Sequence, residues 1–146
     1  MILLPIVWQR LVGPDGKTCD RCQATHKEIK RAVNTLKEAL HPLGIEPTLK
    51  TRAMDERSFK VNPSESNRIW ISGKPMEVWL GAKVGSSRCC SVCGDSECRT
   101  VEVGGTTFEA IPEKLFLKAA LIASAQLLDP TTESPRHKRE HPCCET

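Results

Sequence analysis

Alternating apolar and polar stretches in the first third of the chain predict a strand, a helix and a second strand. Residues 2–12 are largely apolar and predict a buried strand, which the turn residues 13–16 end. A helical stripe follows over residues 24–40, with a Thr-x-x-Glu capping box at its start or a start nearer Cys19. Residues 45–53 predict a weaker strand near a sheet edge, because a proline interrupts it. The helical stripe consists of Ile29, Val33, Leu36 and Leu40.

The middle of the chain predicts an interior strand and a hairpin partner. Residues 55–67 are polar and predict a loop, with or without a helical turn. Residues 68–71 predict a central strand, with Trp70 on the face opposite its two isoleucines. After a turn at residues 73–75, residues 76–80 are expected to return as a neighbouring strand.

The last part predicts a Cys-rich loop, a hairpin, a helix and a tail. Residues 81–99 are rich in Gly, Ser and Cys, and we expect a loop that needs a cross-link to hold its shape. The Gly-Gly pair at 104–105 predicts a hairpin turn, and residues 112–128 predict a closing helix. Residues 129–146 predict a flexible tail that the fold does not need. The expected fold class is α/β, one domain over residues 1–128 with a mixed central sheet flanked by helices.

Length, composition and charge exclude several classes of protein. The chain has 146 residues, of which 39% are hydrophobic and 27% charged, as in globular domains. Its formal net charge of +3 is too small to predict a nucleic-acid partner. No apolar run approaches the roughly 20 residues that span a bilayer, so no membrane partner is expected. The apolar residues 1–7 lack the flanks of a signal peptide, which predicts a cytoplasmic protein.

The eight cysteines of the chain are the strongest indication of its function. In a reducing cytosol, clustered cysteines indicate metal binding or thiol chemistry more often than structural disulfides. Cys19 and Cys22 follow a strand and begin a helix, which is the sequence form of a thioredoxin-like redox motif. Cys19 is then the exposed attacking thiolate, and Cys22 resolves the mixed disulfide. Between them, Arg21 would stabilise the thiolate and Asp20 would oppose it. The alternatives are half of a zinc site and a pair of inert buried thiols.

A second group, Cys89, Cys90, Cys93 and Cys98, falls within ten residues. The spacing of the last three resembles a zinc knuckle, but Val103 stands at its fourth position, so a knuckle is excluded. Thiolate binding of zinc remains open, and so does a disulfide or a relay dithiol. Adjacent Cys89 and Cys90 cannot easily share one ion, because successive side chains diverge.

Cys143 and Cys144 form a vicinal pair near the end of the expected tail. Soft thiolates on a tether suit mercury, arsenic or copper(I), and the alternative is an incidental pair. If the pair delivers such a metal, deleting the tail slows transfer to the second group.

Four segments together resemble the family called domain of unknown function 2703, over roughly residues 5–125. The resemblance implies a thioredoxin-like fold and a cysteine pattern, and it brings no activity. In thioredoxin and glutaredoxin folds, a cis-proline precedes the central strand and faces the cysteines, whereas this chain has Ser66-Asn67 there. The matching segments are 16–22 (GKTCDRC), 71–75 (ISGKP), 81–85 (GAKVG) and 90–100 (CSVCGDSECRT).

The sequence therefore predicts a cytoplasmic thiol–disulfide oxidoreductase that uses Cys19 and Cys22 on a protein dithiol or disulfide partner. The second cysteine group would serve as a metal clip or a relay dithiol. The alternative is a non-catalytic protein that binds zinc or a thiophilic heavy metal through thiolates.

Overall fold

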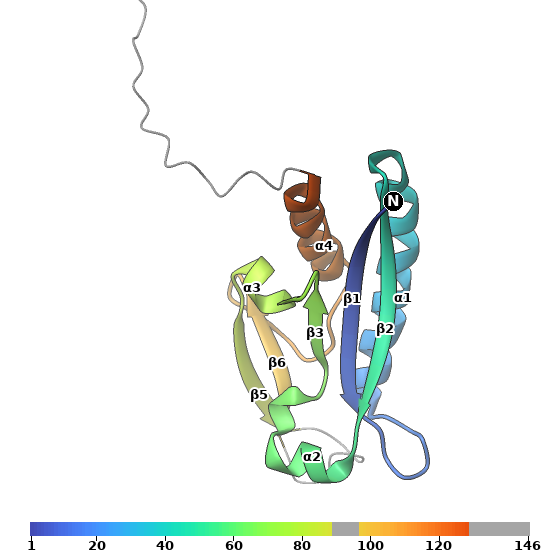
Figure 1. The fold of residues 1–146 in the computed structure, drawn as a ribbon. Helices are drawn as coiled ribbons and strands as arrows, with labels where there is room; N and C mark the ends of the chain where they lie inside the picture. The colour runs from blue at the N-terminus through green and yellow to red at the C-terminus, as the bar shows by residue number, and fades with distance from the viewer. Residues whose placement is uncertain (89–96, 129–146) are drawn as a thin grey trace, which may run out of the picture.

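The computed structural model describes residues 1–88 and 97–128, which form a mixed α/β fold with two sheets (Figure 1). The main sheet has the strand order β2-β1-β3-β4. Its strands are β1 (Ile2–Leu11), β2 (Ile45–Met54), β3 (Arg68–Ile71) and β4 (Lys74–Pro75). β1 pairs with β2 in parallel and with β3 in antiparallel orientation, and β3 pairs with β4 in antiparallel orientation. The predicted mixed sheet is confirmed, with β3 in its interior.

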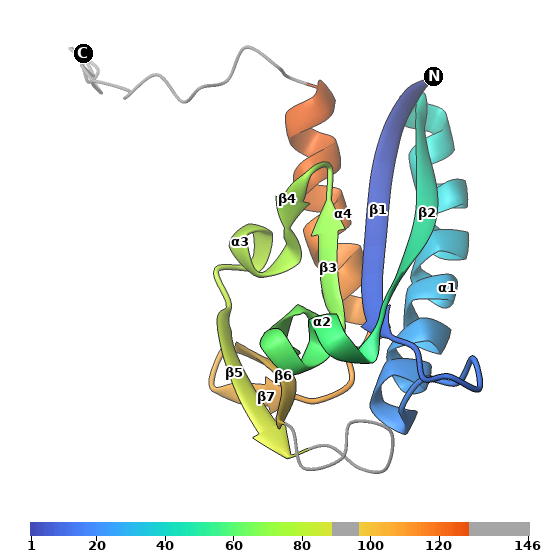
Figure 2. The ribbon, with the colours of Figure 1, turned by 60° about the horizontal axis from the view of Figure 1, so that its bottom comes forward.

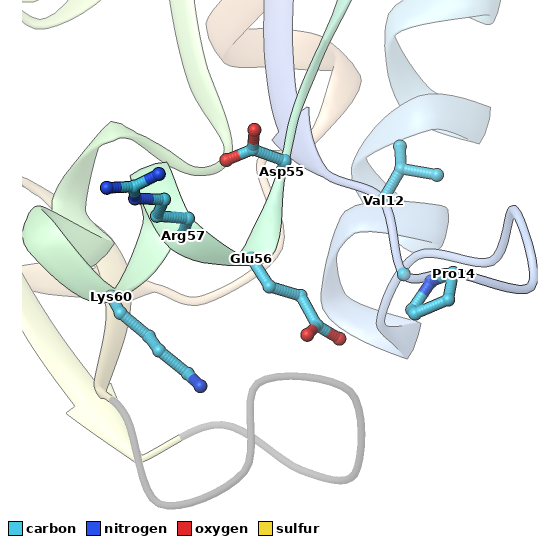
Figure 3. Close-up of a pocket in the computed structure, with 7 residues that line it drawn as sticks. Val12, Pro14, Asp55, Glu56, Arg57 and Lys60 are labelled. Atoms are coloured by element: carbon cyan, nitrogen blue, oxygen red, sulfur yellow. The ribbon is translucent and has the colours of Figure 1, made fainter.

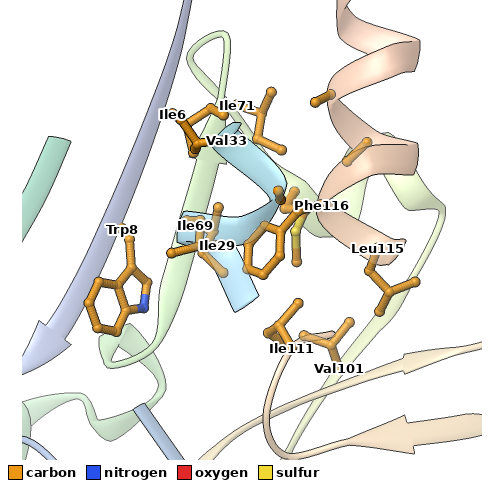
Figure 4. Close-up of a cluster of buried hydrophobic side chains, with 14 of the residues drawn as sticks. Ile6, Trp8, Ile29, Val33, Ile69, Ile71, Val101, Ile111, Leu115 and Phe116 are labelled. Atoms are coloured by element: carbon orange, nitrogen blue, oxygen red, sulfur yellow. The ribbon is translucent and has the colours of Figure 1, made fainter. Parts of the chain in front are cut away.

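Two long helices, α1 (Asp20–Leu40) and α4 (Glu113–Leu128), pack on one face of the main sheet and against each other. Side chains alternate along the strands, so Ile6 and Trp8 of β1 point into the helix layer. Ile69 and Ile71 of β3 do the same, whereas Trp70 lies on the other face, as predicted. Figure 4 shows this core, in which Phe116 of α4 lies among side chains from the sheet and α1.

The second sheet contains β5 (Lys83–Arg88), β6 (Glu97–Val103) and β7 (Thr106–Phe108) in that order, all antiparallel. Figure 2 shows it beside β3 and α2 (Glu56–Val61) rather than as a continuation of the main sheet. Arg99 of β6 joins it to the rest of the fold. Its side chain, 6% exposed, pairs with the Glu77 carboxylate and donates to Ser64 O at 2.9 Å.

Three predicted elements differ from the structure. Residues 76–80 form a helix, α3 (Met76–Leu80), because helical spacing buries Met76 and Leu80 together and lets Trp79 Nε1 donate to Ile71 O at 2.7 Å. Residues 81–99 were predicted as a loop. The described residues at its two ends belong to strands instead, because β5 pairs with the start of β6. Residues 55–67, predicted as a loop with at most a helical turn, contain more helix than that: α2 and the short 3₁₀ helix η2 (Pro63–Glu65). Another 3₁₀ helix, η1 (His41–Leu43), directly follows α1.

The other predicted boundaries agree with the structure. α1 ends before Gly44, whose left-handed backbone (φ 69°) reverses the chain into β2. The hairpin at Gly104-Gly105 joins β6 to β7, and α4 closes the described chain. Residues 129–146, the predicted tail, lie outside the described residues. Within the described ranges, no helix combines the length and apolar character that crossing a membrane requires.

Candidate redox site

The Cys19-x-x-Cys22 motif lies at the start of α1, after the loop that follows β1. The Cys19 backbone is extended (φ −72°, ψ 162°), and its carbonyl accepts the first helical hydrogen bond from Gln23 N–H at 2.9 Å. The Thr18 hydroxyl donates to Leu11 O at 2.8 Å, which ties the loop to the end of β1. The structure therefore places the motif between a strand and a helix, as the sequence predicted. The helix starts at Asp20, which is the predicted alternative near Cys19.

Both cysteines of the motif are buried, each with 2% of its surface exposed. The prediction that Cys19 is the exposed thiol is therefore wrong. Cys98 of β6 is equally buried and belongs to the same apolar cluster, so the second sheet closes over this end of α1. Short-range sequence patterns carry no information about this contact, because β6 follows the motif by many residues.

The Cys22 thiol donates a hydrogen bond to Cys19 Sγ. This hydrogen bond is the largest cause that raises the pKa of Cys22 above its ordinary value, and burial and negative charge on Cys19 raise it further. The hydroxyls of Thr18 and Ser66 act in the opposite direction and lower that pKa. Cys22 therefore keeps its proton while that proton stabilises negative charge on Cys19.

Ser66 and Asn67, which precede β3, form the other wall of the site. Ser66 Oγ lies 4.0 Å from Cys22 Sγ and accepts a hydrogen bond from Leu11 N–H at 2.9 Å. Asn67 has a left-handed backbone (φ 58°), and its side-chain amide donates to Thr25 Oγ1 at 3.2 Å. Asn67 Oδ1 also accepts from Trp8 Nε1 at 2.9 Å. These bonds fix the wall against β1 and α1.

Sequence reasoning missed the structural role of Thr25. It was expected in a capping box at the helix start, and it is instead fully buried one turn inside α1. Its hydroxyl oxygen accepts from both Asn67 Nδ2 (3.2 Å) and Ile111 N–H (3.1 Å). The signal available in the sequence was its position three residues after Cys22, on the same face of the helix.

Arg21 links the motif to the second sheet. Its Nη1 donates to Cys98 O at 3.4 Å, and its Nη2 donates to Arg88 O at 3.1 Å. Nη2 also lies 3.4 Å from a carboxylate oxygen of Glu109. Arg21 thus clamps the facing ends of β5 and β6 at the start of α1.

The remaining predicted site residues are only partly placed by the structure. Cys89, Cys90 and Cys93, and the pair Cys143 and Cys144, lie outside the described residues. None of the three described cysteines is joined in a disulfide. Over residues 1–88 and 97–128, no group of three His, Cys, Asp or Glu side chains is arranged to hold a metal ion.

An open cavity of about 520 Å³ lies beside the loop that leads to the motif (Figure 3). It lies at the carboxyl ends of the parallel strands β1 and β2, between Val12 and Pro14 on one side and the start of α2 on the other. Asp55 caps α2 through a bond from Ser58 N–H at 2.7 Å, and hydrogen bonding to Ser58 lowers the pKa of that carboxyl.

We expect Ser66→Ala to destabilise the fold by about 1–2 kcal/mol, because it leaves the buried Leu11 N–H without an acceptor. It also removes a hydroxyl that lowers the pKa of Cys22, so the pH at which Cys22 ionises rises further. Urea unfolding measures the first effect. Ser64→Ala is the matched control, because the Ser64 hydroxyl bonds only at an exposed position, to Asn62 Oδ1. Equal stability of the two variants would contradict this role.

His26 predicts a dependence of stability on pH. Its ring stacks on buried Trp8 at 4.8 Å between centroids, and its pKa lies below the ordinary 6.5 because of partial burial and the charges of Lys30 and Arg10. Because the pKa of His26 is lower in the folded state, the unfolded chain binds the proton more tightly. The contribution of the neutral His26 ring to stability is therefore complete above pH 6.5 and is lost as the pH falls. The stability difference between wild type and His26→Gln should therefore shrink on acidification in urea titrations. A difference that is constant from about pH 5 to 8 would contradict this.

The fold and site define a mixed α/β protein with a buried Cys-x-x-Cys motif at a helix start. The sequence matches the family described as "Domain of unknown function (DUF2703)" over residues 4–120, and the chain belongs to that family. It is 47% identical, over 112 residues, to an uncharacterized protein of Archaeoglobus fulgidus, a match that covers 77% of this chain and 81% of the relative. No solved structure matches the chain significantly.

Proposed function

We propose that this protein is a thiol–disulfide oxidoreductase in which Cys19 attacks and Cys22 resolves. The observation that carries the proposal is the position of Cys19 and Cys22 at the start of α1, after the loop that follows β1. The interaction with Cys19 and burial raise the pKa of Cys22, which fits a Cys22 that holds its proton while Cys19 attacks.

The topology supports this proposal. A parallel β1-α1-β2 unit is followed by the antiparallel pair β3-β4 and a helix, and the strand order is β2-β1-β3-β4. Thioredoxin-like proteins share this arrangement and carry their cysteines at the same place, after the first strand of the unit. Here Ser66, in place of the proline, faces the second cysteine.

Disulfide exchange at Cys19 and Cys22 takes place in two steps. Cys19 thiolate forms a bond to one sulfur of a partner disulfide, that S–S bond breaks, and the leaving partner thiolate takes a proton. Cys22 then loses its proton, and its thiolate attacks Cys19 Sγ. The mixed disulfide bond breaks, and the partner sulfur leaves as a thiolate that takes up a proton. The chain ends with a Cys19–Cys22 disulfide, and the partner ends as a dithiol, having gained two electrons and two protons.

The Arg21 clamp favours a role for the second cysteine group. Arg21 binds both Arg88 O and Cys98 O, the described residues that flank the segment carrying Cys89, Cys90 and Cys93. Arg88 at the end of β5 and Cys98 near the start of β6 are thereby held at the Cys19-x-x-Cys22 motif. The second cysteines would act as a relay dithiol for the first pair, and the second candidate function is thiolate binding of zinc or a thiophilic heavy metal by this group.

The proposal is tested by equilibrating the full chain in glutathione buffers of graded redox potential. Alkylation followed by peptide mass mapping then reports the fraction of the Cys19–Cys22 disulfide. We expect one reversible two-electron transition for this pair. If the pair stays reduced at all potentials, or becomes oxidised only when the chain is denatured, the oxidoreductase proposal fails. Protection of Cys90, Cys93 and Cys98 by added zinc would support the metal-binding candidate instead.

A further inference from the structure

The outer edge of β2 carries backbone groups without a neighbouring described strand. β2 lies at the end of the main sheet and pairs over its 10 residues with β1. Ile2 N–H donates to Gly44 O at 2.8 Å, and Val12 N–H donates to Met54 O at 3.2 Å. Because backbone direction alternates along a strand, the even-numbered residues of β2 face β1 and the odd-numbered ones face outward. The outward N–H donors belong to Ile45, Leu49, Thr51 and Ala53.

A groove runs between this edge and α1. Two adjoining cavities, of about 420 and 340 Å³, share Lys37, Glu46 and Pro47 in their lining. The floor is apolar, with Val33 from the helix and Leu49 from the strand. An extended chain laid along β2 would bond to the outward backbone groups and place alternate side chains on this floor.

Positive charge flanks the edge on both faces of the sheet. Lys30 and Lys37 are exposed on α1 above the groove. Lys50 is exposed on the opposite face of β2, where Glu46 is the one acidic side chain of the strand. Arg52, on the same face, reaches inward over Trp70 of β3 and donates to Gln9 Oε1 of β1. A segment with carboxylates on either face therefore meets opposite charge, whereas a basic segment is repelled.

We propose that the outer edge of β2 binds an extended acidic segment of a partner protein by strand addition. A second copy of the chain fits less well, because β2-to-β2 pairing would bring the Lys30 and Lys37 stripes of two α1 helices together. The backbone of Pro47 points to the outer edge, although its side chain is buried, and it has no N–H. In a β2-to-β2 pair, each copy would therefore lose one interstrand hydrogen bond. The proposal is independent of the redox chemistry.

The test titrates the full chain into a fluorescent peptide of the length of β2 that alternates glutamate with threonine. Binding is followed by anisotropy, and we expect affinity to fall as salt rises. The double variant Lys30→Glu, Lys37→Glu should bind at least about tenfold more weakly. The double variant Lys114→Glu, Lys118→Glu, at exposed positions of α4, is the charge-matched control and should bind as wild type.

A second variant tests the backbone contacts. Thr51→Pro removes an outward N–H and leaves the ladder to β1 intact, so it should weaken peptide binding about tenfold, whereas Thr51→Ala should not. The proposal is overturned if the glutamate peptide does not bind, if a lysine–threonine peptide binds equally well, or if neither Thr51→Pro nor the lysine reversals weaken binding. It is also overturned if the chain sediments as a dimer that Thr51→Pro dissociates, since the occupant would then be a second copy.

Discussion

Cys19→Ser is expected to lower the rate of thiol–disulfide exchange by at least about a thousandfold, because it removes the sulfur that attacks. Cys22→Ser should have a different effect: Cys19 still attacks, but the mixed disulfide is no longer resolved and accumulates. Incubation of each variant with oxidised glutathione, acid quenching and mass mapping of Cys19 distinguishes the two results.

The matched control for this pair replaces Cys143 and Cys144, the vicinal cysteines of the predicted tail. That double variant loses as many thiols as the two single variants together, and we expect exchange at Cys19 to continue at the wild-type rate. If it loses as much activity as Cys19→Ser, the attacking thiol lies in the tail, and the roles assigned to Cys19 and Cys22 are wrong.

Arg99→Ala is expected to destabilise the chain by about 3 kcal/mol. The substitution leaves the Glu77 carboxylate, 15% exposed, without its partner, and it frees Ser64 O at the junction between the second sheet and the rest of the fold. Glu77→Ala should be costly for the same reason. The double variant should cost less than the sum, because both charges are then gone.

The exposed pair Arg31 and Glu28 provides the comparison for Arg99. The two groups are 4.0 Å apart, and the Arg31 side chain is 67% exposed. Arg31→Ala should leave the free energy of unfolding within about 0.5 kcal/mol of wild type. If Arg31→Ala lowers the free energy of unfolding as much as Arg99→Ala does, burial is not the reason why the Arg99–Glu77 pair stabilises the fold.

The sequence predicted correctly those elements in which the pattern of apolar residues by itself defines the buried face. The apolar stripe from Ile29 to Leu40 and the alternation around Trp70 specify one buried face each, and α1 and β3 form as predicted. The sequence MEVWL fits a strand or a helix equally well. Its outcome as α3 depends on burial of Met76 with Leu80 and on the bond from Trp79 to Ile71 O.

The motif itself was predictable, and its surroundings were not. A strand followed by Cys-x-x-Cys is a short-range signal, and it located Cys19 and Cys22 correctly at a helix start. Their burial, the bonds from Arg21 to Arg88 O and Cys98 O, and the approach of Ser66 to Cys22 all join distant parts of the chain. Such contacts follow from how the second sheet docks, which no periodicity encodes.

Native mass spectrometry of the full chain purified without added metal, before and after treatment with oxidised dithiothreitol, distinguishes a redox pair from a metal site at Cys19 and Cys22. For a redox pair, we expect the reduced chain to carry no metal at these two cysteines. Oxidation should remove the mass of two hydrogen atoms, and peptide mapping should assign this loss to a Cys19–Cys22 disulfide, which dithiothreitol reverses. A chain that retains a metal ion protecting both thiols, or in which the pair never forms that disulfide, would contradict the oxidoreductase proposal.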